Sequence, residues 1–248
     1  MSNLNVSNKR KKLGLILPSS NTTTEPDFHR VLPDNVSLHT SRIWVVDVTH
    51  DGLEEMNRDA ELAAKYVGTT EPDAIAYACT SGSFIGGPGY DQALLARITD
   101  EAGGVASVGT SPSMVEALRA VGVKRVAVVT PYTEAINEGL TTFLTAHGFD
   151  VLSMAGMGIV SNLEIGDQSP KAILAFAKAN LDSSADGFFL SCTNWRSMEI
   201  ADQLERETGK PVVTSNQATV WAAMRALDVR EPVDGYGRLL REPTLADA

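Results

Sequence analysis

The sequence predicts an α/β protein with two pseudo-symmetric lobes, each built on a parallel sheet flanked by helices. Short apolar runs alternate with stretches of helical length along the 248 residues, which is the pattern of parallel sheets. The two cysteines, Cys79 and Cys192, each follow such a run and lie 113 positions apart. The segment 12–18 resembles 125–131 at the same spacing. An internal duplication accounts for both repeats and predicts a cleft between two similar lobes, to which each lobe contributes one thiol.

The first half begins with the run 13–17, which reads as a buried parallel strand because it is short, apolar and followed by turn residues. Three more strands are expected at 36–48, 73–79 and 105–109. Apolar residues near helical spacing predict helices at 53–67, 91–102 and 111–120. Pro112 suits the first turn of the last helix.

The second half repeats this order. Strands are expected at 125–130, 151–154, 211–216 and in the run that ends at Cys192, with a loop through 156–166 and helices at 169–180, 197–208 and 217–227. The tail 230–248 has little periodicity and is interpreted as a loosely packed end or an oligomer contact. The expected division is an N-terminal lobe of 1–112 to which 215–248 returns, and a second lobe of 113–214.

Composition excludes several classes of partner. A net charge of −10 argues against nucleic acid, which needs a basic face. The one basic run, 9–12, is interpreted as a solvated arm. No apolar stretch approaches the roughly 20 residues needed to span a bilayer, so no membrane partner is expected. Without a secretion signal the protein is expected to be cytoplasmic, with both cysteines reduced.

The two cysteines are candidate catalytic residues because they occupy the same place in the same local pattern. A thiol between a strand end and a helix start lies near backbone N–H groups, which should lower its pKa toward neutrality. One thiolate and one thiol would supply a nucleophile or base and a proton donor. The alternative for either cysteine alone is an inert buried thiol. The four histidines show no ligand spacing, so no metal is expected.

Two polar or glycine-rich loops are also candidates. The hydroxyl- and amide-rich loop 18–24 follows the first strand, where ligands collect in open α/β sheets. It could equally serve to cap the following helix. The glycines between 82 and 89 form neither a dinucleotide-binding nor a Walker motif, and favour close backbone packing around a small ligand.

Three motifs carry a resemblance to a known superfamily: Pro18-Ser19-Ser20-Asn21-Thr22, Ala78-Cys79-Thr80-Ser81-Gly82 and Ser191-Cys192-Thr193-Asn194. The sequence resembles the aspartate/glutamate racemase superfamily, and within it the maleate cis–trans isomerases. This resemblance implies two pseudo-symmetric α/β lobes, a cysteine pair and no cofactor. It also implies conversion of maleate, or a close small unsaturated dicarboxylate, to the trans isomer, and a homodimer or a higher homo-oligomer is expected.

The resemblance assigns roles to individual residues. Cys79 would add to one vinylic carbon as a thiolate, and Cys192 would deliver and recover the proton at the other. The substrate would be held by a set of polar residues, namely Ser20, Asn21, Thr80, Ser81, Tyr132, Asn162, Thr193 and Asn194. The alternative for Tyr132 and Asn162 is helix capping and loop filling.

Other functions stay open at this point. Amino-acid racemases generally carry Asn-Thr after the first cysteine and His or Glu two residues after the second, and Thr80-Ser81 and Asn194 depart from that pattern. Arylmalonate decarboxylases keep only the second cysteine, so Cys79 argues against that reaction. A relative that acts in ectoine breakdown and a non-catalytic carboxylate-binding protein are further alternatives.

Overall fold

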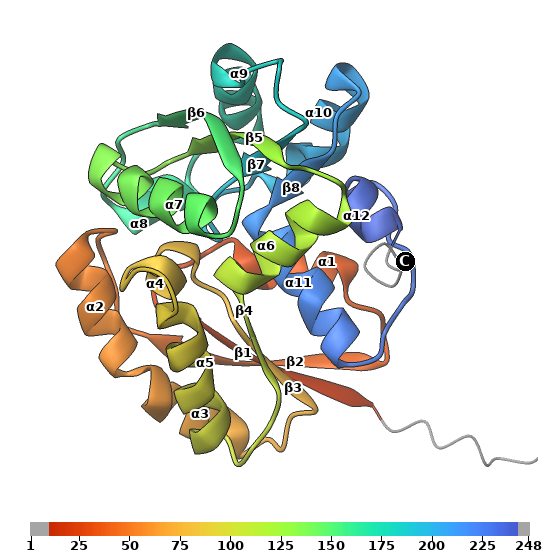
Figure 1. The fold of residues 1–248 in the computed structure, drawn as a ribbon. Helices are drawn as coiled ribbons and strands as arrows, with labels where there is room; N and C mark the ends of the chain where they lie inside the picture. The colour runs from red at the N-terminus through yellow and green to blue at the C-terminus, as the bar shows by residue number, and fades with distance from the viewer. Residues whose placement is uncertain (1–9, 243–248) are drawn as a thin grey trace, which may run out of the picture.

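The computed structural model describes residues 10–242 and has two four-stranded parallel sheets flanked by helices (Figure 1). The first sheet has the order β2-β1-β3-β4 and the second the order β6-β5-β7-β8. In chain order the strands are β1 (Lys11–Pro18), β2 (Val36–Ile43), β3 (Ala74–Tyr77), β4 (Ser107–Gly109), β5 (Arg125–Thr130), β6 (Asp150–Gly156), β7 (Gly187–Leu190) and β8 (Val212–Thr214). The predicted α/β class with two similar parallel sheets is confirmed.

The register of the two sheets repeats the sequence spacing. Leu13 pairs with Ala74 in the first sheet, and Val126 pairs with Gly187 in the second. Each member of the second pair lies 113 positions after its counterpart, which is also the spacing of the two cysteines. The duplicated segments therefore form equivalent strands, and the two thiols follow equivalent strand ends.

Helices cover both sheets and fill the space between them. The first half contains α1 (Thr24–Val31), α2 (His50–Arg58), α3 (Ala60–Gly68), α4 (Thr80–Phe84), α5 (Tyr90–Glu101) and α6 (Thr110–Ala120). The second half contains α7 (Glu134–Ala146), α8 (Asn162–Gly166), α9 (Pro170–Asn180), the 3-10 turn η1 (Met198–Ile200), α10 (Ala201–Thr208), α11 (Ser215–Ala226) and α12 (Arg238–Arg241). None of the helices within 10–242 is long and apolar enough to cross a membrane.

The inner strands are buried on both faces, which is why their sequences are continuously apolar. β3 and β7 are buried along their whole length. α11 is buried almost throughout and packs against α6, β3 and β4 of the first half as well as β8 (Figure 1). Its position at the centre brings the start of a C-terminal helix next to both cysteine loops. The division of the chain at residues 112 and 215 stays a prediction.

Several element boundaries differ from expectation. The helix expected at 53–67 is two helices that meet at Asp59, and the loop expected at 156–166 contains the short α8. The strand expected to reach 48 ends at Ile43, and the next residues cross toward the second half. Lys11 and Lys12 belong to β1, so the basic run is not simply an arm. Lys9 lies outside the described residues.

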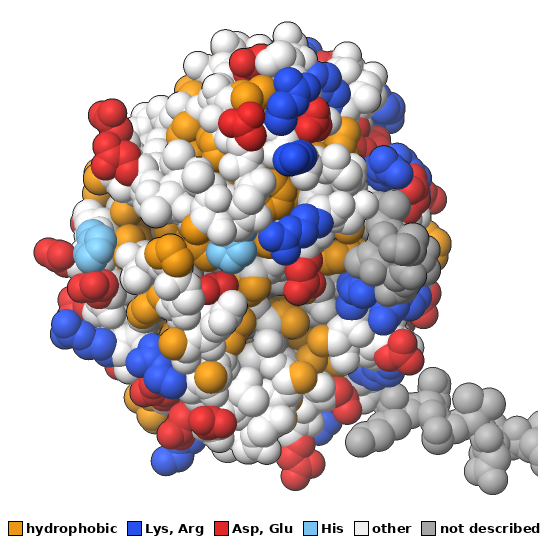
Figure 2. Space-filling view, viewed as in Figure 1, with side chains coloured by type: hydrophobic (Ala, Val, Ile, Leu, Met, Phe, Trp, Pro, Cys, Tyr) orange, Lys and Arg blue, Asp and Glu red, His pale blue; other side chains and the backbone are white. Residues whose placement is uncertain are grey.

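The tail was expected to be a loosely packed end or an oligomer contact, and its described part, 230–242, packs on the fold. Leu239 and Leu240 of α12 are buried, so this part of the expectation is wrong. α12 packs against α11 and β8, and its apolar pair is buried there. Four residues are too few for hydrophobic periodicity to reveal such a helix. Residues 243–248 lie outside the described range. Charges of both signs are interspersed over the face shown in Figure 2, with no broad basic patch on that face.

Candidate active site

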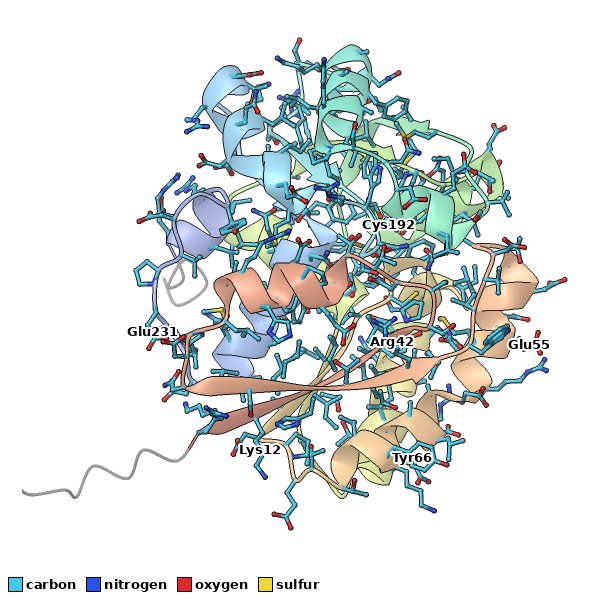
Figure 3. All side chains as sticks on the ribbon, turned by 180° about the vertical axis from the view of Figure 1, so that it is seen from behind. Lys12, Arg42, Glu55, Tyr66, Cys192 and Glu231 are labelled. Carbon is cyan, nitrogen blue, oxygen red and sulfur yellow. The ribbon has the colours of Figure 1, made fainter. Side chains whose placement is uncertain are left out.

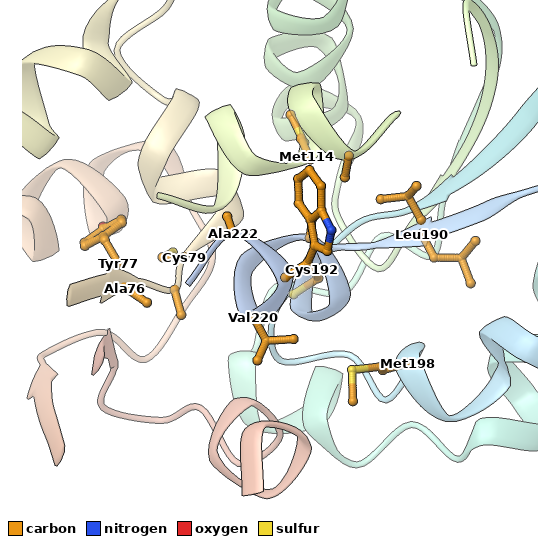
Figure 4. Close-up of a cluster of buried hydrophobic side chains, with 14 of the residues drawn as sticks. Ala76, Tyr77, Cys79, Met114, Leu190, Cys192, Met198, Val220 and Ala222 are labelled. Carbon is orange, nitrogen blue, oxygen red and sulfur yellow. The ribbon is translucent and has the colours of Figure 1, made fainter. Parts of the chain in front are cut away.

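The two thiols face one small cavity between the sheets. Cys79 and Cys192 both line it, and both are only 4% exposed. Figure 3 shows Cys192 between the layers of the molecule, and Figure 4 places it in the same buried cluster as Cys79. The complete lining consists of Pro18, Val45, Val48, Leu53, Cys79, Thr80, Ser81, Tyr132, Asn162, Cys192 and Thr193. The structure thus brings together seven of the ten residues predicted from the sequence.

The cavity is closed in this conformation. Its volume is about 10 Å³, which is room for about one water molecule. The segment 44–48 forms part of the cover, because the N–H of Val48 donates to the Val160 carbonyl (2.8 Å) and the N–H of Asn162 donates to the Val46 carbonyl (3.0 Å). These bonds flank an antiparallel bridge between Asp47 and Ser161. The cover is therefore held by backbone hydrogen bonds from the opposite half.

Cys79 follows β3 and is the N-cap residue of α4. Its backbone is extended (φ −144°), and its sulfur accepts a hydrogen bond from the Gly82 N–H at 3.3 Å. Burial raises the pKa of this thiol to about 11, although the Gly82 N–H, the Ser81 hydroxyl and the Tyr77 hydroxyl each act to lower it. The expected fall of the pKa toward neutrality is therefore wrong for the closed cavity, because desolvation outweighs these donors.

Cys192 follows β7 in a different backbone conformation. Its φ is 131°, in the region that favours glycine, and its N–H donates to the Ser215 hydroxyl at 2.9 Å. Burial raises the pKa of the Cys192 thiol to about 12, against the hydrogen bonds from the Tyr132 hydroxyl and from the backbone N–H groups of Asn194 and Trp195. The expected lowering is wrong here too, and for the same reason. The two cysteines are equivalent in topology but not in local geometry.

Tyr132 and Asn162 both reach the cavity, from the second half of the chain. Burial raises the pKa of the Tyr132 phenol well above its ordinary value, so it is a neutral hydrogen-bond donor beside Cys192. The side-chain amide of Asn162 donates to the Ser20 hydroxyl (2.8 Å), which donates to the Val45 carbonyl (2.6 Å). Both residues line the cavity, and their contact with a substrate stays a prediction. Ser20 lies one hydrogen bond behind the lining.

Three predicted residues lie in the wall behind the cavity. Ser20 is joined to it through Asn162. The Asn21 amide oxygen accepts from the N–H groups of Thr23 and Thr24, both at 2.9 Å, which is the capping role considered for this loop. The Asn194 side chain accepts from Thr22 N–H (2.8 Å) and donates to the Asn162 carbonyl (2.6 Å). Direct substrate contact by these three residues stays a prediction.

Sequence reasoning missed a serine that joins the two cysteine loops. Ser215 begins α11, and its hydroxyl accepts both from Thr80 Oγ1 (2.8 Å) and from the Cys192 N–H. The same helix supplies Asn216, which donates to the Thr193 carbonyl at 3.0 Å. The available signal was the similarity of 106–111 to 211–216, since Ser111 contacts the Thr80 carbonyl (3.1 Å) at the corresponding helix start.

The cavity lining carries few ionisable groups. Among the described residues that line it, the two cysteines and Tyr132 are the titratable ones. Within 10–242 there is no group of three or more His, Cys, Asp or Glu side chains placed to hold a metal ion. The chemistry available to the lining residues themselves is that of two thiols, a phenol and neutral hydrogen-bonding groups.

Comparison with known proteins supports the same interpretation. The profile of the arylmalonate decarboxylase family matches residues 13–240. The chain is 31% identical to the maleate isomerase of Nocardia farcinica over 247 residues, which cover 96% of this chain and 98% of the relative.

Two solved structures are similar over nearly the whole chain. A cysteine-to-alanine variant of the maleate isomerase Iso from Pseudomonas putida S16, solved with maleate, has a TM-score of 0.89 and 26% identity, and covers 93% of this chain and 97% of that one. A cysteine-to-serine mutant of the Nocardia farcinica maleate cis–trans isomerase has a TM-score of 0.88 and 31% identity, with coverage of 93% and 98%. It carries a covalently bound succinylcysteine intermediate. The chain belongs to the maleate isomerase and arylmalonate decarboxylase family of the aspartate/glutamate racemase superfamily.

Proposed function

We propose that this enzyme isomerises maleate, or a close small unsaturated dicarboxylate, to the trans isomer without a cofactor. The observation that carries the proposal is the pair of thiols, Cys79 and Cys192, on one closed cavity with neutral donors around them. A thiol that adds to an alkene carbon converts the double bond to a single bond, and this removes the barrier to rotation. The maleate complex and the succinylcysteine intermediate of the relatives support this chemistry.

The first step is ionisation of Cys79. Burial is the main reason that its pKa is high, so the thiol should lose its proton to solvent while the cleft is open. The resulting thiolate keeps the Gly82 N–H as a donor. Closure over the substrate then places a desolvated, reactive sulfur against a vinylic carbon.

The covalent steps use both cysteines. The Cys79 sulfur forms a C–S bond with one vinylic carbon, and the Cys192 thiol gives its proton to the other, which leaves a succinyl thioether and a Cys192 thiolate. The former double bond rotates. The Cys192 thiolate then removes a proton from the carbon that it protonated, the C–S bond breaks, and the trans acid and the Cys79 thiolate are regenerated. Protons and electron pairs balance over the cycle.

The neutral donors are assigned to the substrate carboxylates. Tyr132 and Asn162 line one side of the cavity, and Thr80, Ser81 and Thr193 come from the two cysteine loops. Hydrogen bonds from neutral groups hold a dianion without adding a fixed positive charge. This arrangement leaves the substrate free to rotate about its central bond when the double bond has been lost.

The substrate requires the cavity to open. Because the closed space holds about one water molecule, a four-carbon diacid cannot enter without displacement of its cover. The backbone bonds that join the segment 44–48 to the second half are those from the Val48 N–H to the Val160 carbonyl and from the Asn162 N–H to the Val46 carbonyl. Opening therefore has to break only a small number of hydrogen bonds. We assign the opening to this segment.

The direct test is incubation with maleate in reducing buffer, followed by proton NMR. Fumarate from the intact enzyme supports the proposal, and its absence contradicts the substrate assignment. A C192A variant should retain a covalent adduct on Cys79 whose mass equals that of one maleic acid, detected by intact mass spectrometry. A C79A variant gives the matched control and should show neither adduct nor turnover.

Arylmalonate decarboxylation is the second candidate, because that family profile matches residues 13–240. Release of carbon dioxide from phenylmalonate, with no turnover of maleate, would favour it.

Two further expectations stay predictions. Light scattering tests the expected homodimer or higher homo-oligomer, and cell fractionation tests the expected cytoplasmic location.

A further inference from the structure

The buried carboxyl group of Asp27 lies outside the cavity and has no role in the proposed chemistry. Asp27 is in the first turn of α1 and is 0% exposed. One of its oxygens, Oδ1, accepts from Arg30 Nη1 at 2.8 Å. The other, Oδ2, accepts from the side-chain amide of Asn216 at 2.7 Å. Burial of a carboxylate costs free energy unless hydrogen bonds compensate for it. The groups that bond to Asp27 therefore indicate its role.

Asn216 connects Asp27 to the second cysteine loop. The same side-chain NH₂ group that donates to Asp27 also donates to the Thr193 carbonyl at 3.0 Å. Both partners of this NH₂ group are acceptors, so the amide has only one orientation that satisfies them. The amide oxygen then faces Thr24 Oγ1 at 3.3 Å, and this hydroxyl also lies 3.0 Å from the Thr193 carbonyl as a second donor.

The carbonyl that Asn216 holds belongs to the residue directly after Cys192. The neighbouring Ser215 accepts from the Cys192 N–H at 2.9 Å, so two successive residues of α11 hold the peptide group before Cys192 and the peptide group after Thr193. Cys192 has a φ of 131°, a conformation that an ordinary side chain adopts only when its surroundings impose it. The loop therefore depends on external partners for its shape.

We infer that Asp27 is a positioning residue: its carboxylate orients the Asn216 amide, which holds the Thr193 carbonyl and thereby keeps Cys192 in the geometry for proton transfer. The inference rests on the proposed isomerase function for its kinetic consequence. Asp27 does not touch the cavity, and its effect is transmitted through two hydrogen bonds.

The Asp27 carboxyl group should gain and lose its proton within the physiological range of pH. Burial raises its pKa to about 6, although the hydrogen bond from Asn216 and the charge of Arg30 lower it. The other charged groups that face it are Glu199, which raises its pKa, and Arg196. α11 contributes the neutral Asn216. Protonation near pH 6 would weaken the charge-assisted bond to the amide.

The kinetic test compares two substitutions at 27 at pH 8. D27V removes both acceptors, and we expect kcat to fall about 10- to 100-fold with KM changed less than about twofold, because misplacement of a reacting group acts on the chemical step. D27N retains an oxygen that can face Asn216, so we expect a loss of less than about fivefold. R30M is the control, because it removes the other partner of Asp27 and should leave kcat within about twofold.

An NMR measurement tests the inference without any turnover. In the wild type, the Asn216 side-chain amide and the backbone amides of Cys192 and Thr193 should shift together with a midpoint near pH 6. D27N should abolish this shift, and R30M should move the midpoint upward. If only the Asn216 signal titrates, or if folded D27V retains wild-type kcat, the inference is wrong. If the wild type forms no fumarate, the proposed function fails, and the NMR result still decides on the positioning role.

Discussion

The Thr193 hydroxyl donates a 3.2 Å hydrogen bond to the Ala78 carbonyl and so joins the residue after one cysteine to the residue before the other. Both groups are buried. The two thiols are therefore not held by separate lobes that merely face each other. Their loops are bonded directly, and the distance between the sulfurs is set by this contact and by Ser215, which touches both loops.

The T193V variant should lose both stability and turnover. It removes the Thr193 hydroxyl that donates to the buried Ala78 carbonyl, and loss of such a partner costs about 1–3 kcal/mol. We expect a lower urea midpoint and a fall in kcat of about tenfold or more, because Cys192, the proposed proton donor, shifts relative to Cys79, the proposed nucleophile. T142V is the control, since the Thr142 hydroxyl bonds only within its own exposed helix turn. Equal effects of the two variants would contradict this role for Thr193.

The free energy of unfolding should decrease as the pH rises above 9. A thiol whose folded pKa is raised contributes stability that is complete below its ordinary value and lost as the pH passes the folded value. For Cys79, a rise from 9.0 to about 11 corresponds to about 3 kcal/mol. Urea titrations at pH 8 and pH 10.5 should show a smaller decrease in the C79A variant than in the wild type. An identical decrease would contradict the buried neutral thiol.

Ionisation of Asp27 should lower the stability of the folded protein, although we infer that the ionised form supports turnover. A rise of its pKa from 3.8 to about 6 means that its ionisation on the folded protein costs about 3 kcal/mol, a cost that appears as the pH rises through this interval. D27N lacks this ionisation, so its stability relative to the wild type should increase from pH 4 to pH 7. Thermal unfolding of both proteins at the two pH values measures the difference. A relative loss at pH 7 would show that the carboxylate is a net stabilising group.

A disulfide between residues 47 and 161 should lock the cavity. These residues form an antiparallel bridge with hydrogen bonds on both sides, which is the close type of pair, with Cα atoms about 4.5 Å apart, as a disulfide requires. Oxidised D47C/S161C should lose turnover, and a reductant should restore it. The single variants D47C and S161C control for the substitutions. Full activity of the oxidised form would show that the substrate enters by another route.

The sequence predicted the architecture because the duplication is visible in apolar runs and in the cysteine spacing. Leu13 and Val126 pair with equivalent partners, as the common spacing requires. It did not predict the short α8, because five residues carry too little periodicity to detect. It also did not predict the break at Asp59, where α2 ends and α3 begins. The sequence motifs identified seven residues of the cavity lining. They did not identify Ser215 or Asn216, whose hydrogen bonds to the Cys192 loop depend on where α11 packs.

The pKa of the thiols could not be predicted correctly from local sequence. The Gly82 N–H does lower the pKa of Cys79, as expected from the position of this residue before a helix. The opposing effect is burial, to which residues far from Cys79 in sequence contribute, among them Val45, Val48 and Leu53 of the cavity lining. Local pattern identified the donors, and only the tertiary structure revealed how dry the site is.

The backbone conformation of Cys192 carries a cost in the stability of the folded protein. A φ of 131° suits glycine better than a residue with a side chain, so the fold holds Cys192 in this conformation at a cost of about 1–3 kcal/mol.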